Sequence, residues 1–262
     1  MDPALRAAAT GMMAQQTRTE VIANNLANVN TTAFKRSRAH FVDLLYQTVQ
    51  GAAAVGGADA ATTPAVQVGR GTRLAGIQRL HSQGADEQTN RPLDLSIEGE
   101  GFFQVSLPNG GTAYTRDGAF ELSDTGTLVT SGGLTVLPGV KVPTGASQFT
   151  VAQNGIVSVK QGDKTEPVEV GRIELARFAN PSGMEALGEN LYAATPASGE
   201  AAPGFPGDEG VGRLLQGHLE ASNVEIVQEM VDMIAAMRAY EINSKAIKNS
   251  EQMADIANQL VR

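Results

Sequence analysis

The sequence has no cysteine and no tryptophan, and only 5% of its 262 residues are aromatic. Without cysteine the chain can form no disulfide, no thiolate nucleophile and no cysteine-based zinc or iron–sulfur site. The low aromatic content, together with 29 glycines, favours a turn-rich β domain joined to helices over the deep core of an enzyme. Thiol-based chemistry is therefore excluded.

An excess of positive charge and a long apolar run are also missing. The formal net charge is -8, so we expect no general attraction to nucleic acid. No stretch is apolar over the length needed to cross a bilayer, so we expect no membrane insertion. The first residues, Met1–Arg6, lack the basic start and apolar run of a secretory signal peptide. If the chain leaves the cytosol, we expect another export route to carry it.

Residues that could carry catalysis or hold a metal are scattered along the chain. His40, His81 and His218 are the only histidines, and neither a paired spacing nor a carboxylate pair accompanies them. Surface or packing roles are the simpler interpretation of all three. The glycine-rich pieces Gly69–Gly71 and Gly99–Phe103 match neither a dinucleotide-binding fingerprint nor a P-loop. We expect no catalytic, cofactor-binding or metal-binding residues, and no enzyme activity.

The first segment, from Asp2 to about Val29, has the pattern of a helix, with Asp2 as an N-cap candidate and Pro3 at the first position. Two heptad-spaced series run along it: Leu5, Met12, Thr19 and Leu26, and Ala8, Gln15, Ile22 and Val29. This seam is apolar at both ends and polar in the middle. Because so narrow a stripe cannot stabilise an isolated helix, it predicts a partner helix.

The last segment, from about Asn223 to the C-terminus, is predicted to form a longer helix opened by a capping box at Ser222–Glu225. One apolar stripe comprises Ile226, Met230, Met233, Met237, Tyr240 and Ile247, and a second, rotated stripe comprises Ile242, Ala246, Met253, Ile256 and Leu260. Apolar surface on more than one side of so long a helix predicts several neighbours.

Between the helices the pattern changes to period two with turn signals, which indicates an antiparallel meander of short strands. Asp117-Gly118 is the strongest hairpin signal, and other turn signals stand at Asp124–Gly126, Ser131–Gly133 and Asn154–Gly155. The stretch Gly51–Ala65 is rich in alanine and glycine and predicts a linker or an extended interaction segment.

The predicted fold class is α+β. The N- and C-terminal helices, in residues 1–45 with 217–262, are expected to pair into an axial helical domain. Residues 46–70 are expected to form a linker or extended insertion, and residues 71–216 a central all-β domain of short antiparallel strands.

The segment Ala23–Lys35 resembles the N-terminal signature of flagellar rod and hook proteins, a run of Asn, Leu and Ala followed by Asn-Thr-Thr, an aromatic residue and Lys. The resemblance continues through Pro92–Leu95, Gly101–Phe103, Tyr114–Gly118, Leu137–Pro138, Gly188–Tyr192, Gln216–Val224 and Arg238–Lys245, and so covers nearly the whole chain. Ala33 departs from the pattern, because this family usually has glycine there. If that position needs a positive φ, alanine carries strain.

The resemblance implies a structural subunit that polymerises through its terminal helices. The implied assembly motif comprises Asn24, Asn25, Leu26, Ala27, Asn28, Asn30, Thr31, Thr32, Phe34 and Lys35. The implied assembly helix comprises Leu219, Ser222, Asn223, Val224, Met230, Met233, Met237, Arg238, Tyr240, Asn243 and Ser244. The basic cluster Lys35, Arg36 and Arg38 is either a solvated helix end or a contact with an acidic face of a neighbouring subunit.

Within the family, the length, the Leu80–Gly84 segment and the insertion at Gly51–Ala65 look most like a subunit of the distal rod. The resemblance then implies a rigid, hollow helical drive shaft in the flagellar basal body, which crosses the periplasm to the outer membrane and transmits torque from motor to hook. The implied partners are further copies of the chain, proximal rod proteins and hook protein along the axis, the L and P ring proteins, and the flagellar type III export apparatus, with no cleaved signal peptide.

Two alternatives stay open. The chain could be another flagellar axial protein, from the proximal rod or the hook. From a different class, a β-rich carbohydrate-binding or hydrolytic protein would need a concave cluster of aromatics or paired carboxylates, and the sequence has no Trp and only 4 Tyr.

Overall fold

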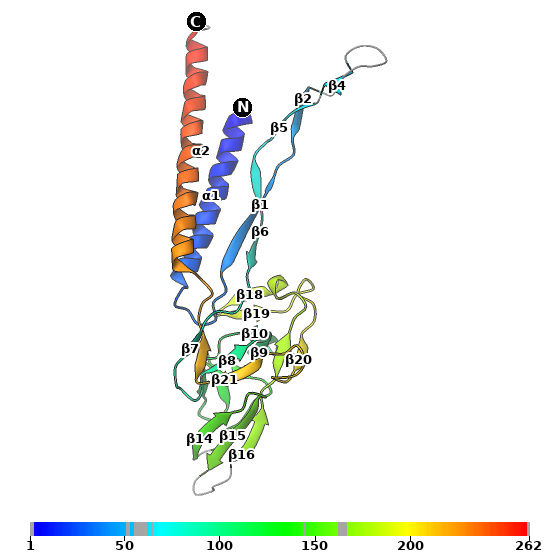
Figure 1. Cartoon of the computed structure of the whole chain (residues 1–262), viewed down its shortest axis with the longest axis vertical. Coiled ribbons are helices and arrows are strands. Elements are labelled where there is room, and N and C mark those ends of the chain that lie inside the picture. The colour runs from blue at the N-terminus through cyan, green and yellow to red at the C-terminus, as the bar shows by residue number, and fades with distance from the viewer. Residues whose placement is uncertain are drawn as a thin grey trace. The chain divides into compact units, whose positions relative to one another are not determined.

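The computed structural model describes residues 3–50, 53–54, 62–63, 65–143, 145–161 and 167–260. The chain divides into two compact units: Met1–Ala27 with Ser37–Gln78 and Glu225–Arg262, and Asn28–Arg36 with Arg79–Val224. The predicted α+β class is confirmed, because the terminal helices pack together in the first unit and antiparallel strands fill the second (Figure 1). Residues 28–36 and 217–224, expected in the helical domain, belong to the β-rich unit, and residues 46–78, expected to form a linker and the start of the β domain, belong to the helical unit.

In the helical unit, α1 (Pro3–Ala27) packs along α2 (Ile226–Leu260) (Figure 1). The buried apolar side chains on these helices are mostly small: Ala8, Ala14, Ile22 and Ala236. Arg18 forms a salt bridge to Asp232 at 2.9 Å, and a methyl group at Gly11 would lie only 2.9 Å from Asn243 Nδ2. The helices therefore approach closely but bury little apolar surface against each other.

A β-ribbon completes the helical unit (Figure 1). Its paired strands are β1 (Ser37–Asp43) with β6 (Thr72–Arg79), β2 (Gln47–Gln50) with β5 (Val66–Val68), and β3 (Ala53–Ala54) with β4 (Thr62–Thr63). The ribbon packs on α1, where the Thr72 N–H donates to Thr10 Oγ1 at 3.3 Å. Gly71 has a φ of +108°, and a Cβ there would lie 2.1 Å from the same oxygen, so only glycine fits. Most of the predicted insertion Gly51–Ala65 lies outside the described residues.

The β-rich unit is built from short antiparallel strands around one larger sheet. The elements are β7 (Asp86–Gln88), β8 (Leu95–Glu98), β9 (Phe102–Ser106), β10 (Thr112–Thr115), β11 (Phe120–Leu122), β12 (Leu128–Thr130), β13 (Thr135–Val136), β14 (Ala146–Val151), β15 (Ile156–Gln161), β16 (Val168–Arg172), β17 (Leu175–Arg177), η1 (Pro181–Gly183), β18 (Glu185–Gly188), β19 (Leu191–Ala193), β20 (Ala202–Gly204), β21 (Arg213–Gln216) and β22 (His218–Glu220). The larger sheet has the order β11-β12-β13-β9-β10-β19-β18, with β17 paired to β9 and β20 to β17. Smaller sheets are β14-β15-β16, β21-β8 and β22-β7.

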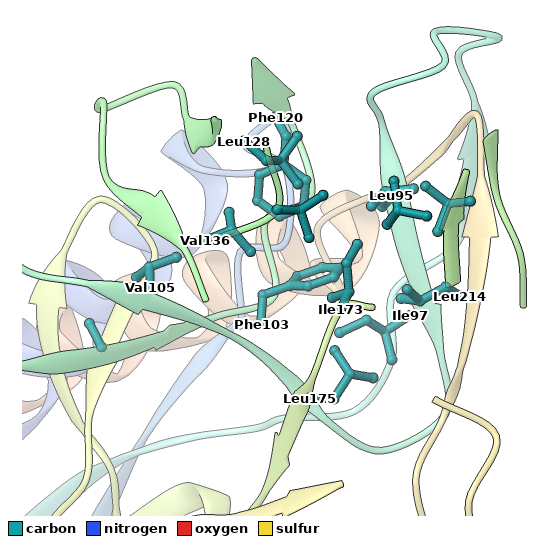
Figure 2. Packing of buried hydrophobic residues seen from close by; sticks show 14 of the residues in the cluster. Leu95, Ile97, Phe103, Val105, Phe120, Leu128, Val136, Ile173, Leu175 and Leu214 are labelled. Atoms are coloured by element: carbon teal, nitrogen blue, oxygen red, sulfur yellow. The ribbon is translucent and has the colours of Figure 1, made fainter. Parts of the chain in front are cut away.

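Two apolar clusters hold the β-rich unit together. Successive residues of a strand point to opposite faces of the sheet, so Phe103 enters the larger cluster and Phe102 the smaller one. Phe103 meets Phe120 edge to face, with ring centroids 5.0 Å apart. Figure 2 shows the labelled side chains of β8, β9, β11, β12, β13, β17 and β21 converging on this larger cluster. The core therefore joins strands from most of the length of this unit.

The turn signals were only partly right. Those at Asp124–Gly126, Ser131–Gly133 and Asn154–Gly155 are confirmed, because they connect the paired strands β11/β12, β12/β13 and β14/β15. The predicted hairpin at Asp117-Gly118 is wrong, since β10 pairs with β9 and β19 while β11 pairs with β12. A simple meander is wrong for the same reason. Gly118 instead allows a close approach of two chain segments, because a Cβ there would lie 1.6 Å from the Leu95 carbonyl oxygen.

Both helices are shorter at their inner ends than predicted. α1 ends at Ala27 instead of about Val29, and α2 begins at Ile226 instead of about Asn223. The capping box at Ser222–Glu225 is not formed in that register, and Ser222 Oγ accepts the N–H of Val224 at 3.3 Å. The predicted N-cap Asp2 lies outside the described residues. Asn223 stays out of the helix because its backbone and side chain bond to other loops, as described below.

Candidate assembly interface

The first part of the predicted assembly motif forms the end of α1. Asn25 is buried, while Asn24 and Ala27 are exposed and Leu26 is half-buried. Asn25 Nδ2 donates to the Ser37 carbonyl at 2.9 Å and to Glu229 Oε2 at 3.1 Å, and its Oδ1 accepts the Ser37 N–H at 2.8 Å. This one side chain therefore ties α1 to α2 and to β1 inside the helical unit.

The second part of the motif belongs to the β-rich unit. Thr32 Oγ1 donates to Asp117 Oδ1 at 3.2 Å, and Asn190 Nδ2 donates to the Thr32 carbonyl at 2.8 Å. Ala33 is buried with a φ of 55°, so the positive φ suspected from the sequence is present. Thr31, Phe34 and Asn28 are half-buried, and Asn30 is exposed. The motif is thus divided between the two units.

Lys35 lies inside the β-rich unit with its side chain 0% exposed. Its Nζ donates to the Glu220 carboxylate and to the Ser82 carbonyl, the latter at 2.8 Å. Glu220 also accepts the Gly84 N–H at 2.8 Å and Arg116 Nη1 at 3.4 Å. Burial lowers the pKa of Lys35, and the charge of Glu220 opposes that shift. Neither sequence-based interpretation of the basic cluster describes Lys35, because its charge is neither solvated nor available to a neighbouring subunit.

Four residues of the predicted assembly helix lie before α2. Leu219 is in β22, Ser222 and Asn223 are half-buried, and Val224 is buried. They belong to the β-rich unit. These residues therefore take part in the fold of that unit, ahead of the helix.

The remaining residues of the predicted assembly helix lie on α2. Met230, Met237, Arg238 and Tyr240 are exposed, and Met233, Asn243 and Ser244 are half-buried. α2 thus presents large apolar side chains outward along much of its length.

The burial and pairing of the charged residues that organise these contacts were not predicted from the sequence. Glu220, Arg116 and Glu229 are buried partners of the motif residues. Glu220 stands in the segment Gln216–Val224, which carried the resemblance, but no charge pattern there pointed to Lys35, 185 residues away. Spacing reveals partners within one helix or hairpin and gives no access to pairs this far apart.

The histidines have the packing or surface roles expected of them. His40 bonds to Gln78 at 3.1 Å, and His218 Nδ1 lies 3.0 Å from the Gln216 carbonyl. His81 packs edge-on against Phe102 and Tyr192, with centroids 5.7 and 5.3 Å apart. Burial, and then the positive charges of nearby cations, lowers the pKa of His81 to about 4.

Metal ligands, a membrane-spanning helix or a cavity that could hold a ligand would indicate other chemistry in the described part of the chain. Among those residues no three His, Asp or Glu side chains gather as potential metal ligands. Neither described helix combines the length and apolar character that crossing a bilayer requires. A cavity of about 390 Å³ in the β-rich unit is lined by hydroxyls and by Asp117 and Glu189. Burial raises the pKa of Asp117, although N–H and hydroxyl donors oppose the shift. No histidine lines this cavity.

Comparisons with known proteins cover the same segments. The family "Flagella basal body rod protein" matches residues 5–35, "Flagellar hook protein FlgE/F/G D1 domain" matches residues 96–159, and "Flagellar basal body rod FlgEFG protein C-terminal" matches residues 215–260. These matches fall on α1 and the motif, on the β-rich unit, and on β21 through α2.

Individual relatives are similar over almost their whole length. The flagellar basal-body rod protein FlgG of Borreliella burgdorferi is 51% identical over 261 residues, which is 99% of this chain and 98% of that protein. FlgG of Caulobacter vibrioides is 47% identical over 258 residues, 98% of each chain. FlgF of the same organism is 35% identical over 258 residues, 97% of this chain and 96% of that one. The relatives are structural proteins, so the expectation of no enzyme activity is confirmed. The chain belongs to the family of flagellar basal-body rod proteins.

Proposed function

We propose that this chain is a structural subunit of the flagellar distal rod, which polymerises through α1 and α2 into a rigid, hollow drive shaft that transmits torque from motor to hook. The observation that carries the proposal is the apolar surface of α2, which the chain's own fold leaves uncovered. Similarity to rod proteins supplies the biological setting.

The exposed surface of α2 is large for a single helix. Its members are Ile226, Val227, Met230, Val231, Ile234, Met237, Tyr240, Ile242, Met253 and Ile256. Val227 is 76% exposed and Met253 64% exposed. Covering such a side chain contributes up to about 1.5–3 kcal/mol, and contiguous apolar surface of this kind marks a protein interface. Further copies of the same chain are the partners we propose, since a rod is a polymer of its subunit.

The geometry of the polymer follows from the kind of contact. A surface that meets a different surface on the next copy does not close on itself, and repeated contacts of that kind generate a helical tube. In our proposal the paired terminal helices line the inside of the tube. Because α1 and α2 bury mostly small side chains, we expect them to be weakly ordered in the monomer and to become ordered during assembly.

The choice of the distal rod rests on the comparisons between relatives. Two FlgG proteins are 51% and 47% identical to this chain, whereas FlgF of Caulobacter vibrioides is 35% identical. We therefore favour the distal rod over a proximal rod or hook position. Locating a tagged copy of the chain in purified basal bodies by electron microscopy separates the three positions.

The partners around the rod are also part of the proposal. We propose axial contacts with proximal rod proteins and hook protein, lateral contacts with the L and P ring proteins, and export by the flagellar type III apparatus without a cleaved signal peptide. The rod would then cross the periplasm to the outer membrane. Photocrosslinking amino acids placed at exposed positions of the β-rich unit would identify, in cells, the residues that contact the ring proteins.

The polymerisation surface is tested by Ile234→Lys, with Val168→Lys as the matched control. Both substitutions place a lysine on an exposed aliphatic position, at 57% and 45% exposure, but Val168 lies on β16 of the β-rich unit. Each variant monomer should fold as the wild-type monomer does, because both positions are exposed. In cells that lack their own copy of the gene, Ile234→Lys should leave basal bodies without a distal rod, while Val168→Lys should restore it. Normal rods from the Ile234→Lys chain would refute the proposed surface.

A further inference from the structure

The chain passes between its two units at four places: 27/28, 36/37, 78/79 and 224/225. On the β-rich side these passages belong to three segments, residues 28–36, 79–84 and 217–224, which we call the crossing segments. Any force that the helical unit exerts on the β-rich unit through the chain must pass through them. Their mutual contacts therefore decide whether the β-rich unit is loaded at separate points or as one body.

Asn223 bonds to both of the other crossing segments. Its N–H donates to the Phe34 carbonyl at 3.4 Å, and its Oδ1 accepts the Arg36 N–H at 2.7 Å. Its Nδ2 donates to the Leu80 carbonyl at 2.8 Å and to Ser82 Oγ at 2.9 Å. One half-buried side chain thus connects three stretches of chain that are far apart in sequence.

Lys35 and Glu220 make a second connection among the same segments. Lys35 Nζ bonds to the Glu220 carboxylate and to the Ser82 carbonyl, and Glu220 Oε1 accepts the Gly84 N–H. The backbone follows the same pattern, because the Ala33 N–H donates to the Glu220 carbonyl at 2.7 Å. Each crossing segment is therefore bonded to both of the others.

The connection also reaches the core strands. Arg116 Nη1 lies 3.4 Å from Glu220 Oε2, and Arg116 Nη2 donates to the Gly99 carbonyl at 2.7 Å. Buried charges of this kind add little net stability compared with apolar side chains of the same shape, but loss of one partner leaves another buried and unpaired. Such a network consequently favours one arrangement of the segments that it joins.

We infer that Lys35, Glu220 and Asn223 form a lock that joins the three crossing segments, so that load arriving at any passage is shared and enters the β-rich unit as a whole. The mechanical part of this inference rests on the proposed function. The lock gives the end of the flagellar motif a role inside one subunit, because Lys35 has no exposed surface with which to contact a second copy.

Hydrogen exchange on the unassembled full-length chain tests the lock with Lys35→Met, which keeps the apolar stem and removes the charge. The reporters are the amides of Ala33, Arg36, Leu80, Gly84 and Asn223, each of which donates across the crossing segments. Their exchange should become about a hundredfold faster, while amides of β9 and β10 keep their protection. Arg38→Met is the matched control, because Arg38 is exposed in β1, and it should leave every reporter unchanged.

A second variant keeps the test decisive if Lys35→Met does not fold. Asn223→Ala introduces no charge and should accelerate exchange at Arg36 and Leu80 with the core of the unit intact. Unchanged reporters in the variant that folds would overturn the inference, and so would equal acceleration of the reporters and of β9, because the segments would then not open separately from the core. The assay needs no polymer, so its result is independent of the Ile234→Lys test of the proposed function.

Discussion

Acidification should destabilise the β-rich unit through His81. The pKa of this histidine in the folded chain is about 4, against an ordinary value of 6.5. Between these values the unfolded chain binds a proton that the folded chain does not, so the free energy of unfolding falls as the pH falls. At about 1.4 kcal/mol per pKa unit, the full loss amounts to about 3 kcal/mol. The causes are burial against Phe102 and Tyr192, followed by the positive charges of Lys35, Arg116 and Arg79.

The measurement is urea unfolding of the chain and of His81→Phe between pH 4 and pH 7, followed by near-ultraviolet circular dichroism of the packed aromatic rings. The wild-type chain should lose about 3 kcal/mol more than the variant over this range. Asp117 acts in the opposite direction, because its raised pKa favours folding as the pH falls, but it is present in both proteins. Equal slopes for the wild type and His81→Phe would refute the assignment.

Three further substitutions, two of them with a control variant, test the packing described above. Gly118→Ala would place a Cβ 1.6 Å from a backbone carbonyl oxygen and should lower the free energy of unfolding by about 3 kcal/mol; Gly76→Ala, with no atom within 4 Å, should change it by less than about 0.5 kcal/mol. Phe103→Ala should cost about 3–5 kcal/mol because the ring is 0% exposed, and Leu122→Ala, at 41% exposure, should cost less than about 1 kcal/mol in the same urea titration. Ala33→Gly relieves about 1–2 kcal/mol of left-handed backbone strain. It also removes a buried methyl group and raises the conformational entropy of the unfolded chain, and both effects favour unfolding. The free energy of unfolding should therefore change by less than about 1 kcal/mol in the same assay.

The two helices and the β-rich middle could be predicted from the sequence because their signals are local. A heptad series identified α1, an apolar stripe identified α2, and alternation with turns identified the strands. The ends of the helices could not be placed in this way. Asn223 looks like a helix start by pattern, yet its bonds to Arg36 and Leu80 hold it in a loop.

The topology and the interior of the candidate site depend on long-range contacts that no local signal reports. Asp117-Gly118 has the composition of a hairpin turn, but Gly118 is needed where the chain passes Leu95. Lys35 is a basic residue just beyond a helix, which usually indicates a solvated side chain. Its burial depends on Glu220, which lies 185 residues away in the sequence and which the fold brings into contact with it. A sequence pattern gives the types of these residues and leaves their partners undetermined.

The distribution of apolar surface indicates the order in which the two units become ordered. In the β-rich unit, large side chains such as Phe103, Phe120 and Leu175 are fully buried by the chain itself, so this unit can fold before assembly. In the helical unit, the chain buries mainly alanines and leaves residues such as Val227 and Ile234 uncovered. Neighbouring subunits can therefore supply more apolar burial to α2 than α1 does. It follows that a subunit should join the polymer with its β-rich unit already locked, and that its helices should become ordered as neighbours cover them.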